Sequence, residues 1–196
     1  MTAENLSTRP PSVQISEREM VQRMQSGDLE VFGQFFDSHV QGVYRYALAR
    51  LGKPQDAEDI TSTVFEKALK SLNENGFNFH GPPMVVWLMR ISRNEVVSFV
   101  RRNQKQTREV VFPEDLVDEG RLDPAETVEK KLIIEEIRWA VSLLPEAQRE
   151  VIFLRFAAGL SIADTSRTLK KRENNVKVLQ HKGIQRLRQV LSPSII

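Results

Sequence analysis

The residues best suited to binding chemistry lie between Ser166 and Leu191, where eight Lys or Arg accompany one acid, Glu173. The cations are residues 167, 170, 171, 172, 177, 182, 186 and 188. Guanidinium and ammonium groups at this density suit phosphates, because the nucleic-acid backbone dominates affinity and requires cations on the approaching surface. A solvated basic helix in an ordinary helical core is the alternative interpretation of the same charges.

Three groups of apolar residues at helical spacing would position these cations. The groups are Val151, Ile152, Leu154 and Phe156, ended by Gly159; Ile162, Ala163, Thr165, Ser166 and Leu169; and Val176, Leu179, Gly183, Ile184, Leu187, Val190 and Leu191. A polar break from Lys170 to Glu173 separates the second group from the third. Two short helices, a tight break and a longer basic helix are typical of a helix-turn-helix, whose last helix enters the major groove of DNA.

A second basic segment, residues 86–108, carries six Lys or Arg against one acid, Glu95. It follows a loop over residues 73–83 that is rich in Gly, Pro and Asn and contains Phe77 and Phe79. Cations beside aromatic rings suit single-stranded or melted nucleic acid, although loop aromatics usually plug a core.

The charge reverses over residues 109–136, which hold ten acids and three cations. Pro113, Gly120 and Pro124 interrupt this stretch and indicate an extended linker. Helix signals flank it, including a capping box at Ser16, an N-cap at Asp28 and a stop at Gly52. The expected fold is all-α, with two small helical domains joined by an acidic linker, the C-terminal one a helix-turn-helix. Its parts are a flexible tail (1–15), an N-terminal helical domain (16–106), the acidic linker (107–123) and a C-terminal domain (124–192).

Composition excludes several classes of function. The chain of 196 residues has no Cys, only three scattered His, and no P-loop, GxSxG or HExxH motif. Asp56, Glu58 and Asp59 cluster on one expected helix, but they do not converge on a metal without partners from elsewhere. We therefore expect no enzyme, no metal and no cofactor. Neither an export signal nor a membrane-length apolar run is visible, so we expect a cytoplasmic protein without membrane insertion.

Several motifs, in this order, resemble bacterial RNA polymerase sigma factors of the extracytoplasmic-function (ECF) type. They are Gly27-Asp28 with Val31-Phe32 and Val43 to Ala47; Ala57-Glu58-Asp59-Ile60 with Val64-Phe65; Phe79-His80-Gly81 with Trp87-Leu88 and Arg93-Asn94; and Leu144-Pro145 with Arg149-Glu150-Val151 and Leu154-Arg155. The resemblance spans residues 16–192. It implies a protein that binds core RNA polymerase and directs promoter-specific initiation through the −10 and −35 elements.

The resemblance also assigns roles to residues. Core polymerase would bind Asp56, Glu58, Asp59 and Phe65. The −10 element would contact Asn78, Phe79, His80, Trp87, Arg90, Arg93, Asn94 and Arg101, with Trp87 either stacking on a base or, as its apolar neighbours favour, packing in the core. The −35 element would contact Arg172, Asn174, Asn175, Lys177, Val178, His181 and Lys182. Expected partners are core RNA polymerase and promoter DNA, together with an anti-sigma factor, which such proteins commonly have.

The recognition segment departs from the family pattern. Lys170 to Val176 stand where the family has a Gly-containing turn, and His80 stands where it often has Arg or Lys. Either Lys170 adopts the left-handed conformation usually left to Gly, at a cost of about 1 kcal/mol, or the turn has another shape. Promoter preference therefore does not transfer from relatives.

Two other functions compete with this interpretation. A conventional helix-turn-helix regulator would bind duplex DNA without polymerase, but it would leave the Arg- and aromatic-containing segment 77–102 without a purpose. A structural helical protein would ignore nucleic acid and show no salt-dependent DNA binding.

Overall fold

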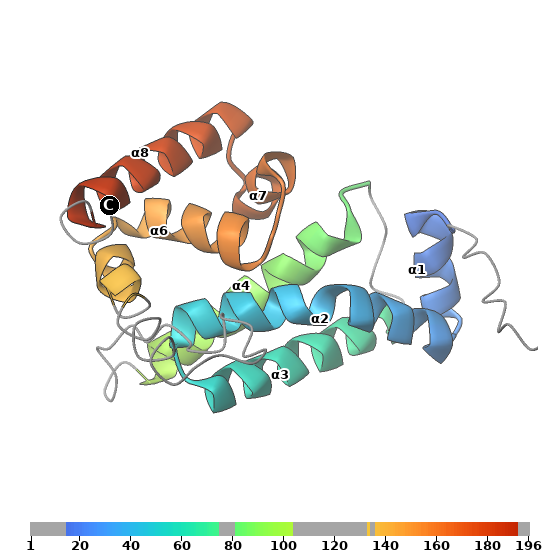
Figure 1. Ribbon diagram of the computed structural model, residues 1–196. Helices are drawn as coiled ribbons and strands as arrows, with labels where there is room; N and C mark the ends of the chain where they lie inside the picture. The colour runs from blue at the N-terminus through green and yellow to red at the C-terminus, as the bar shows by residue number, and fades with distance from the viewer. Residues whose placement is uncertain (1–14, 75–80, 104–132, 134–135, 192–196) are drawn as a thin grey trace, which may run out of the picture.

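The computed structural model describes residues 15–74, 81–103, 133 and 136–191, and every regular element in these ranges is helical (Figure 1). The elements are α1 (Glu17–Gln25), α2 (Leu29–Leu51), α3 (Pro54–Asn73), α4 (Met84–Asn103), α6 (Glu146–Ile152), η2 (Phe153–Ala157), α7 (Ile162–Leu169) and α8 (Glu173–Leu191). The all-α prediction is confirmed. The expected tail and acidic linker lie outside the described residues, as do Phe77, Asn78, Phe79, His80 and the start of the helix expected from Pro124.

The predicted caps define the first helices. The Ser16 hydroxyl accepts a hydrogen bond from the Glu19 amide at 3.2 Å, and the Asp28 carboxylate accepts one from the Val31 amide at 3.2 Å. The Val31 amide and the Arg23 guanidinium lower the pKa of Asp28 because both stabilise its ionised form. Gly52 ends α2 in the left-handed region, at φ 79°, where a side chain would be strained.

The N-terminal domain, α1 to α4, buries one apolar face of each helix. In Figure 1, α2 and α3 run side by side and α4 packs against both. Phe35, Leu72 and Leu88 are fully buried in the shared core. Burial of such side chains supplies about 1.5–3 kcal/mol each, which holds α4 at a fixed place on the α2–α3 pair.

The C-terminal domain, residues 136–191, contains the predicted helix-turn-helix, but its first helix is not regular. A π-helical turn, η2, follows α6 directly, and the Ala158 amide donates to the Phe153 carbonyl at 3.0 Å. Wider turns shift the side-chain pattern relative to an α-helix. Phe156 is 61% exposed in this turn, whereas Leu154 is fully buried.

The turn between α7 and α8 resolves the alternatives at Lys170. This residue adopts the left-handed conformation, with φ 53° and ψ 41°, and ends α7. Its amide and that of Lys171 donate back to the carbonyls of Arg167 and Ser166. The Gly-like turn is thus kept with a lysine in place, and α8 begins at Glu173.

The two domains pack on each other. The η2 turn contacts α2, and α7 contacts α4. A Cβ atom at Gly42 of α2 would lie 3.2 Å from the Ala158 carbonyl oxygen, so the backbones approach closely there. Figure 1 places α8 on the side of α6 that faces away from α2 and α3. No described helix has the length and apolar character needed to cross a membrane.

Candidate nucleic-acid and polymerase interfaces

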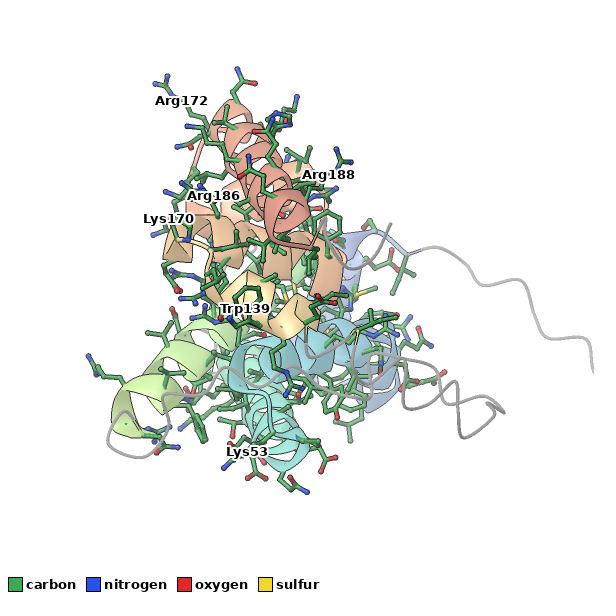
Figure 2. All side chains as sticks on the ribbon, turned by 60° about the vertical axis from the view of Figure 1, so that its left-hand side comes forward. Lys53, Trp139, Lys170, Arg172, Arg186 and Arg188 are labelled. Atoms are coloured by element: carbon green, nitrogen blue, oxygen red, sulfur yellow. The ribbon has the colours of Figure 1, made fainter. Side chains whose placement is uncertain are left out.

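The N-terminal part of α8 and the turn before it carry the predicted −35 residues, and all of them are exposed. They are Arg172, Asn174, Asn175, Lys177, Val178, His181 and Lys182. Val178 is an apolar side chain 51% exposed among these polar groups, a type that suits the methyl group of thymine. Figure 2 shows Arg172 at the tip of the domain, at the far end from Lys53 of the N-terminal domain.

Contacts on the opposite face of α8 hold it against α6 and η2. Val176 is fully buried, and a Cβ at Gly183 would lie 3.2 Å from Cγ1 of Ile152. The Arg155 guanidinium donates to the Gln180 amide oxygen at 3.0 Å. Arg186 likewise donates to the Gln148 amide oxygen at 2.9 Å. The exposed residues of α8 therefore lie on a helix that is fixed in place by contacts on its opposite face.

The predicted −10 residues that the structure describes lie on α4. Asn94 and Arg101 are exposed, whereas Arg90 and Arg93 are half-buried because the C-terminal domain covers them. Trp87 is partly buried and packs against the apolar core, between the fully buried Val86 and Leu88. The structure thus brings the basic groups of α4 together along one helix and places Trp87 against the core.

The acidic start of α3 is a separate surface. Glu58 and Asp59 are exposed and Asp56 is half-exposed, all within the first turns of the helix. Phe65, predicted to touch polymerase, is only 4% exposed and packs against Phe35 and Phe36. Its ring therefore packs α3 against α2. Among the described residues, no group of three or more acids or histidines is arranged to hold a metal ion.

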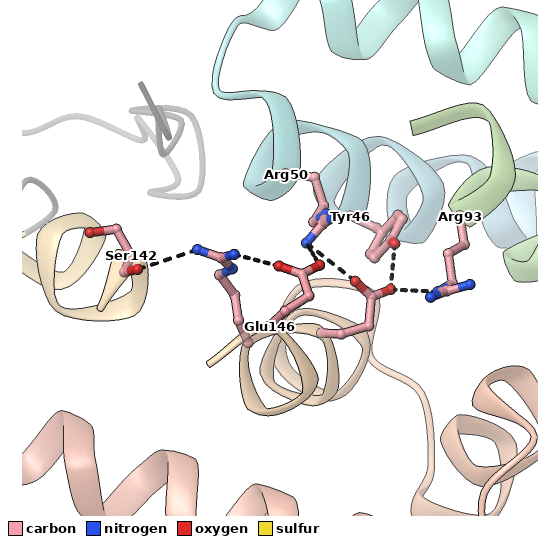
Figure 3. Close-up of polar contacts among 7 residues, drawn as sticks. Tyr46, Arg50, Arg93, Ser142 and Glu146 are labelled. Carbon is pink, nitrogen blue, oxygen red and sulfur yellow. Dashed lines mark hydrogen bonds and ion pairs between the residues drawn. The ribbon is translucent and has the colours of Figure 1, made fainter. Parts of the chain in front are cut away.

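A polar cluster around the buried Tyr46 and Glu150 joins the domains, and sequence reasoning missed it. We call Tyr46, Arg50, Arg93, Glu146 and Glu150 the interdomain cluster (Figure 3). The Tyr46 hydroxyl donates to Oε1 of Glu150 at 2.7 Å. Arg93 and Arg50 lie 3.2 and 3.3 Å from the same carboxylate, and Arg50 also pairs with Glu146 at 2.8 Å. The sequence contained one signal for this cluster, because the carboxylate of Glu150 directly precedes the apolar Val151 and Ile152.

The pKa values of three members of the interdomain cluster are shifted from their ordinary values. It raises the pKa of Tyr46 well above its ordinary value, and the neighbouring Glu150 charge adds to this rise. Burial alone would lower the pKa of Arg50, but Glu150, Tyr46 and Glu146 outweigh it and raise that pKa. Burial would raise the pKa of Glu146, but hydrogen bonds from Arg149 and Arg50 lower it overall. Arg50 therefore stays charged opposite an ionised Glu146 at neutral pH.

Comparisons with known proteins assign both domains to the same family. Residues 35–106 match Sigma-70 region 2, and residues 134–187 match Sigma-70, region 4. The chain is 34% identical over 174 residues to the ECF RNA polymerase sigma factor BldN of Streptomyces coelicolor, covering 88% of this chain and 65% of that protein. It is 28% identical over 165 residues to SigX of Bacillus subtilis, covering 82% and 83%.

Solved structures share the fold. CnrH in complex with the cytosolic domain of CnrY superposes with a TM-score of 0.67 at 20% identity, covering 91% of this chain and 98% of that one. The sigma factor RpoE of Bartonella quintana, in complex with the anti-sigma factor NepR, gives 0.61 at 22% identity, covering 84% and 98%. With both regions matched in order and an exposed recognition helix in the second, this chain belongs to the ECF-type RNA polymerase sigma factors.

Proposed function

We propose that this sigma factor binds core RNA polymerase through the acidic start of α3, contacts melted −10 DNA through α4 and reads −35 duplex DNA through α8. The observation that supports it best is that every predicted −35 residue is exposed, on the first turns of α8 and the turn before them. In this proposal the chain itself catalyses nothing and acts in the cytoplasm, where the polymerase supplies the chemistry.

Specificity at the −35 element would come from the α8 N-terminus. Asn174 and Asn175 have the amide pair that recognises adenine, and Arg172 has the fork that recognises guanine. Each such contact contributes about 1–3 kcal/mol of discrimination. Lys170 and Lys171 in the turn and Arg188 further along α8 are also exposed, and they would contact phosphates. Phosphate contacts would fix the register of the helix without selecting sequence.

The acidic start of α3 would meet a basic surface of polymerase. Charge complementarity of this kind steers association and fixes register. Glu58 and Asp59 are exposed, so their carboxylates remain available to a partner. Glu66, exposed on the same helix about two turns later, provides a matched control position.

Promoter-specific transcription by the purified chain and core polymerase tests the proposal. Wild-type chain should direct initiation from selected members of a randomised-promoter pool, and Glu58→Lys with Asp59→Lys should weaken core binding about tenfold or more. Glu66→Lys should change core binding much less. A chain that fails to bind core yet binds duplex DNA tightly would instead be a conventional helix-turn-helix regulator.

An anti-sigma partner also belongs to this proposal. A groove of about 310 Å³ in the C-terminal domain is lined by apolar side chains, including Val141, Phe156 and Leu187. An amphipathic helix of a protein partner would bury its apolar face there. Phe156→Ser should then weaken capture of this chain by its inhibitor, whereas Val178→Ser, exposed on α8 outside the residues lining this groove, should not.

A further inference from the structure

Val178 is an apolar side chain surrounded by polar ones on the exposed face of α8, and it is 51% exposed itself. The residues three and four positions before and after it are Asn174, Asn175, His181 and Lys182, and all four are polar and exposed. Side chains at these spacings are neighbours on the surface of a helix. Val178 therefore does not extend into an apolar patch along α8, as a docking groove for a protein helix would require.

Packing within the domain does not account for a valine at this position. A β-branched side chain lowers helix propensity relative to Lys, Gln or Glu, because it loses rotamer freedom against the preceding turn. Burial compensates for that loss at Val176, which is fully buried. Val178 lies about 200° round the helix from Val176, on the side that faces away from the core. Single exposed apolar residues are common on protein surfaces, so the position of Val178 is more informative than its exposure.

That position matches one chemical group of duplex DNA. Base edges in the major groove present hydrogen-bond donors and acceptors, and the C5 methyl group of thymine is the apolar group among them. Asn174 precedes Val178 by one helical turn, and His181 follows it by one turn. Hydrogen-bonding side chains thus lie on both sides of the apolar one. This order of side chains suits a base-edge surface in which a methyl group lies between polar groups.

We propose that Val178 selects a thymine in the −35 element by direct contact with the C5 methyl group of that base. The inference rests on the function proposed above for α8 and deepens it, because it names the base and the group that one side chain recognises. A cytosine at the same place lacks the methyl group and presents its N4 amino group. Valine cannot accept a hydrogen bond from this amine, so a covered cytosine loses hydration without compensation.

The neighbours of Val178 limit where this thymine lies in the element. Val178 is four residues beyond Asn174, which corresponds to about 6 Å along the helix axis. Successive base pairs are about 3.4 Å apart. An adenine that Asn174 contacts and the thymine that Val178 contacts should therefore lie within about two base pairs of each other. Lys177 and Lys182 are exposed beside Val178 and would contact phosphates, which fixes the register of the helix.

Replacing thymine by deoxyuridine tests the methyl contact alone, because the two bases pair identically with adenine and differ only by the C5 methyl group. The probe is a promoter duplex selected from a randomised pool by the full chain together with core polymerase. Each thymine of its −35 element, on either strand, is replaced in turn. The complex should bind about fourfold more weakly when one particular thymine is replaced, which is the loss expected for one buried methyl group. Replacement of the other thymines should change the affinity much less.

Variants at Val178 assign this sensitivity to one side chain. Val178→Ser removes the apolar contact, so the thymine and deoxyuridine duplexes should bind with equal affinity. Val178→Thr keeps one of the two methyl groups and should retain part of the difference. Val97→Ser is the matched control, because Val97 is a valine 42% exposed on α4, in the N-terminal domain. It should keep the wild-type ratio of the two affinities. Circular dichroism of each free variant checks that its helices are retained.

Three results would overturn the inference. They are a −35 element selected without any A·T pair, equal affinity of wild type after every thymine replacement, and a deoxyuridine effect that persists unchanged in a folded Val178→Ser chain. Failure of the function proposed for α8 looks different, because the complex would then show no selection of a −35 sequence at all. Sequence-selective binding that ignores the thymine methyl groups would leave that function standing and refute the role of Val178 alone.

Discussion

The Met84 amide, at the first residue of α4, donates to both carboxylate oxygens of Glu17 at 3.3 Å. Glu17 begins α1, which precedes the residues matched to Sigma-70 region 2. A carboxylate at a helix N-terminus satisfies a free amide and complements the helix dipole. The first helix therefore supports the start of the helix that we assign to the −10 strand.

Removing this cap should loosen α4. Glu17→Ala should lower the free energy of unfolding by about 1 kcal/mol, because one N-terminal amide of α4 loses its partner. Urea unfolding monitored by circular dichroism measures the change. Glu66→Ala, an exposed position in the interior of α3, should alter stability by less than about 0.5 kcal/mol.

Lys170→Gly should stabilise the helix-turn-helix by about 1 kcal/mol, because glycine adopts the left-handed conformation of this residue without strain. Lys171→Gly is the control, since no other described non-glycine residue has positive φ. It should be neutral or destabilising. Thermal unfolding of the free chain separates the two, and an equal loss of stability in both would contradict the expectation.

The contact between Gly183 and Ile152 should limit substitution in α8. Gly183→Ala adds a Cβ 3.2 Å from Ile152 Cγ1 but gains helix propensity, so its net effect should stay within about 1 kcal/mol. Gly183→Val adds a branched side chain for which the contact with Ile152 leaves no space. It should lower the free energy of unfolding by about 1–3 kcal/mol. If the Gly183→Val chain proves as stable as the Gly183→Ala chain in thermal unfolding, α6 and α8 do not pack closely at this position.

The contribution of Tyr46 to stability should become visible at alkaline pH. Its pKa in the folded chain lies above the ordinary value of 10.0, so the unfolded chain loses the phenolic proton first. The stability from this group is complete below pH 10.0 and is lost progressively as pH rises toward the folded pKa. Melting temperatures measured from about pH 9 upward should fall less steeply for Tyr46→Phe than for wild type. Tyr44→Phe, which alters the second tyrosine, should retain the wild-type slope.

Local signals in the sequence were sufficient to predict the helices and the exposed face of α8. Ser16, Asp28 and Gly52 mark helix ends through hydrogen bonds and backbone conformations that depend on neighbouring residues alone. The predicted −35 residues are exposed because the helical period separates them from Val176 and Gly183. Charge and period together were therefore enough to predict which face of α8 is free.

Contacts between distant residues were not predictable in the same way. Tyr46 and Glu150 are 104 positions apart, and neither residue type demands the other. The burial of Phe65 depends on Phe35 and Phe36 of a neighbouring helix, which a motif match does not report. The wide turn of η2 was also not visible in the local composition of the chain.

The wide turn of η2 also fixes the rotation of one face of the continuous α6–η2 helix relative to another. Before it, Glu150 points at the N-terminal domain; after it begins, Arg155 reaches Gln180 of α8. Relative to an α-helix, a π turn accommodates roughly one additional residue per turn, so deleting one residue would restore ordinary winding and rotate one surface against the other. A chain shortened by one residue in η2 could therefore keep the contact of Glu150 with the N-terminal domain or the contact of Arg155 with α8, but not both. In this chain, the number of residues in a single turn therefore links the packing of the two domains to the position of α8.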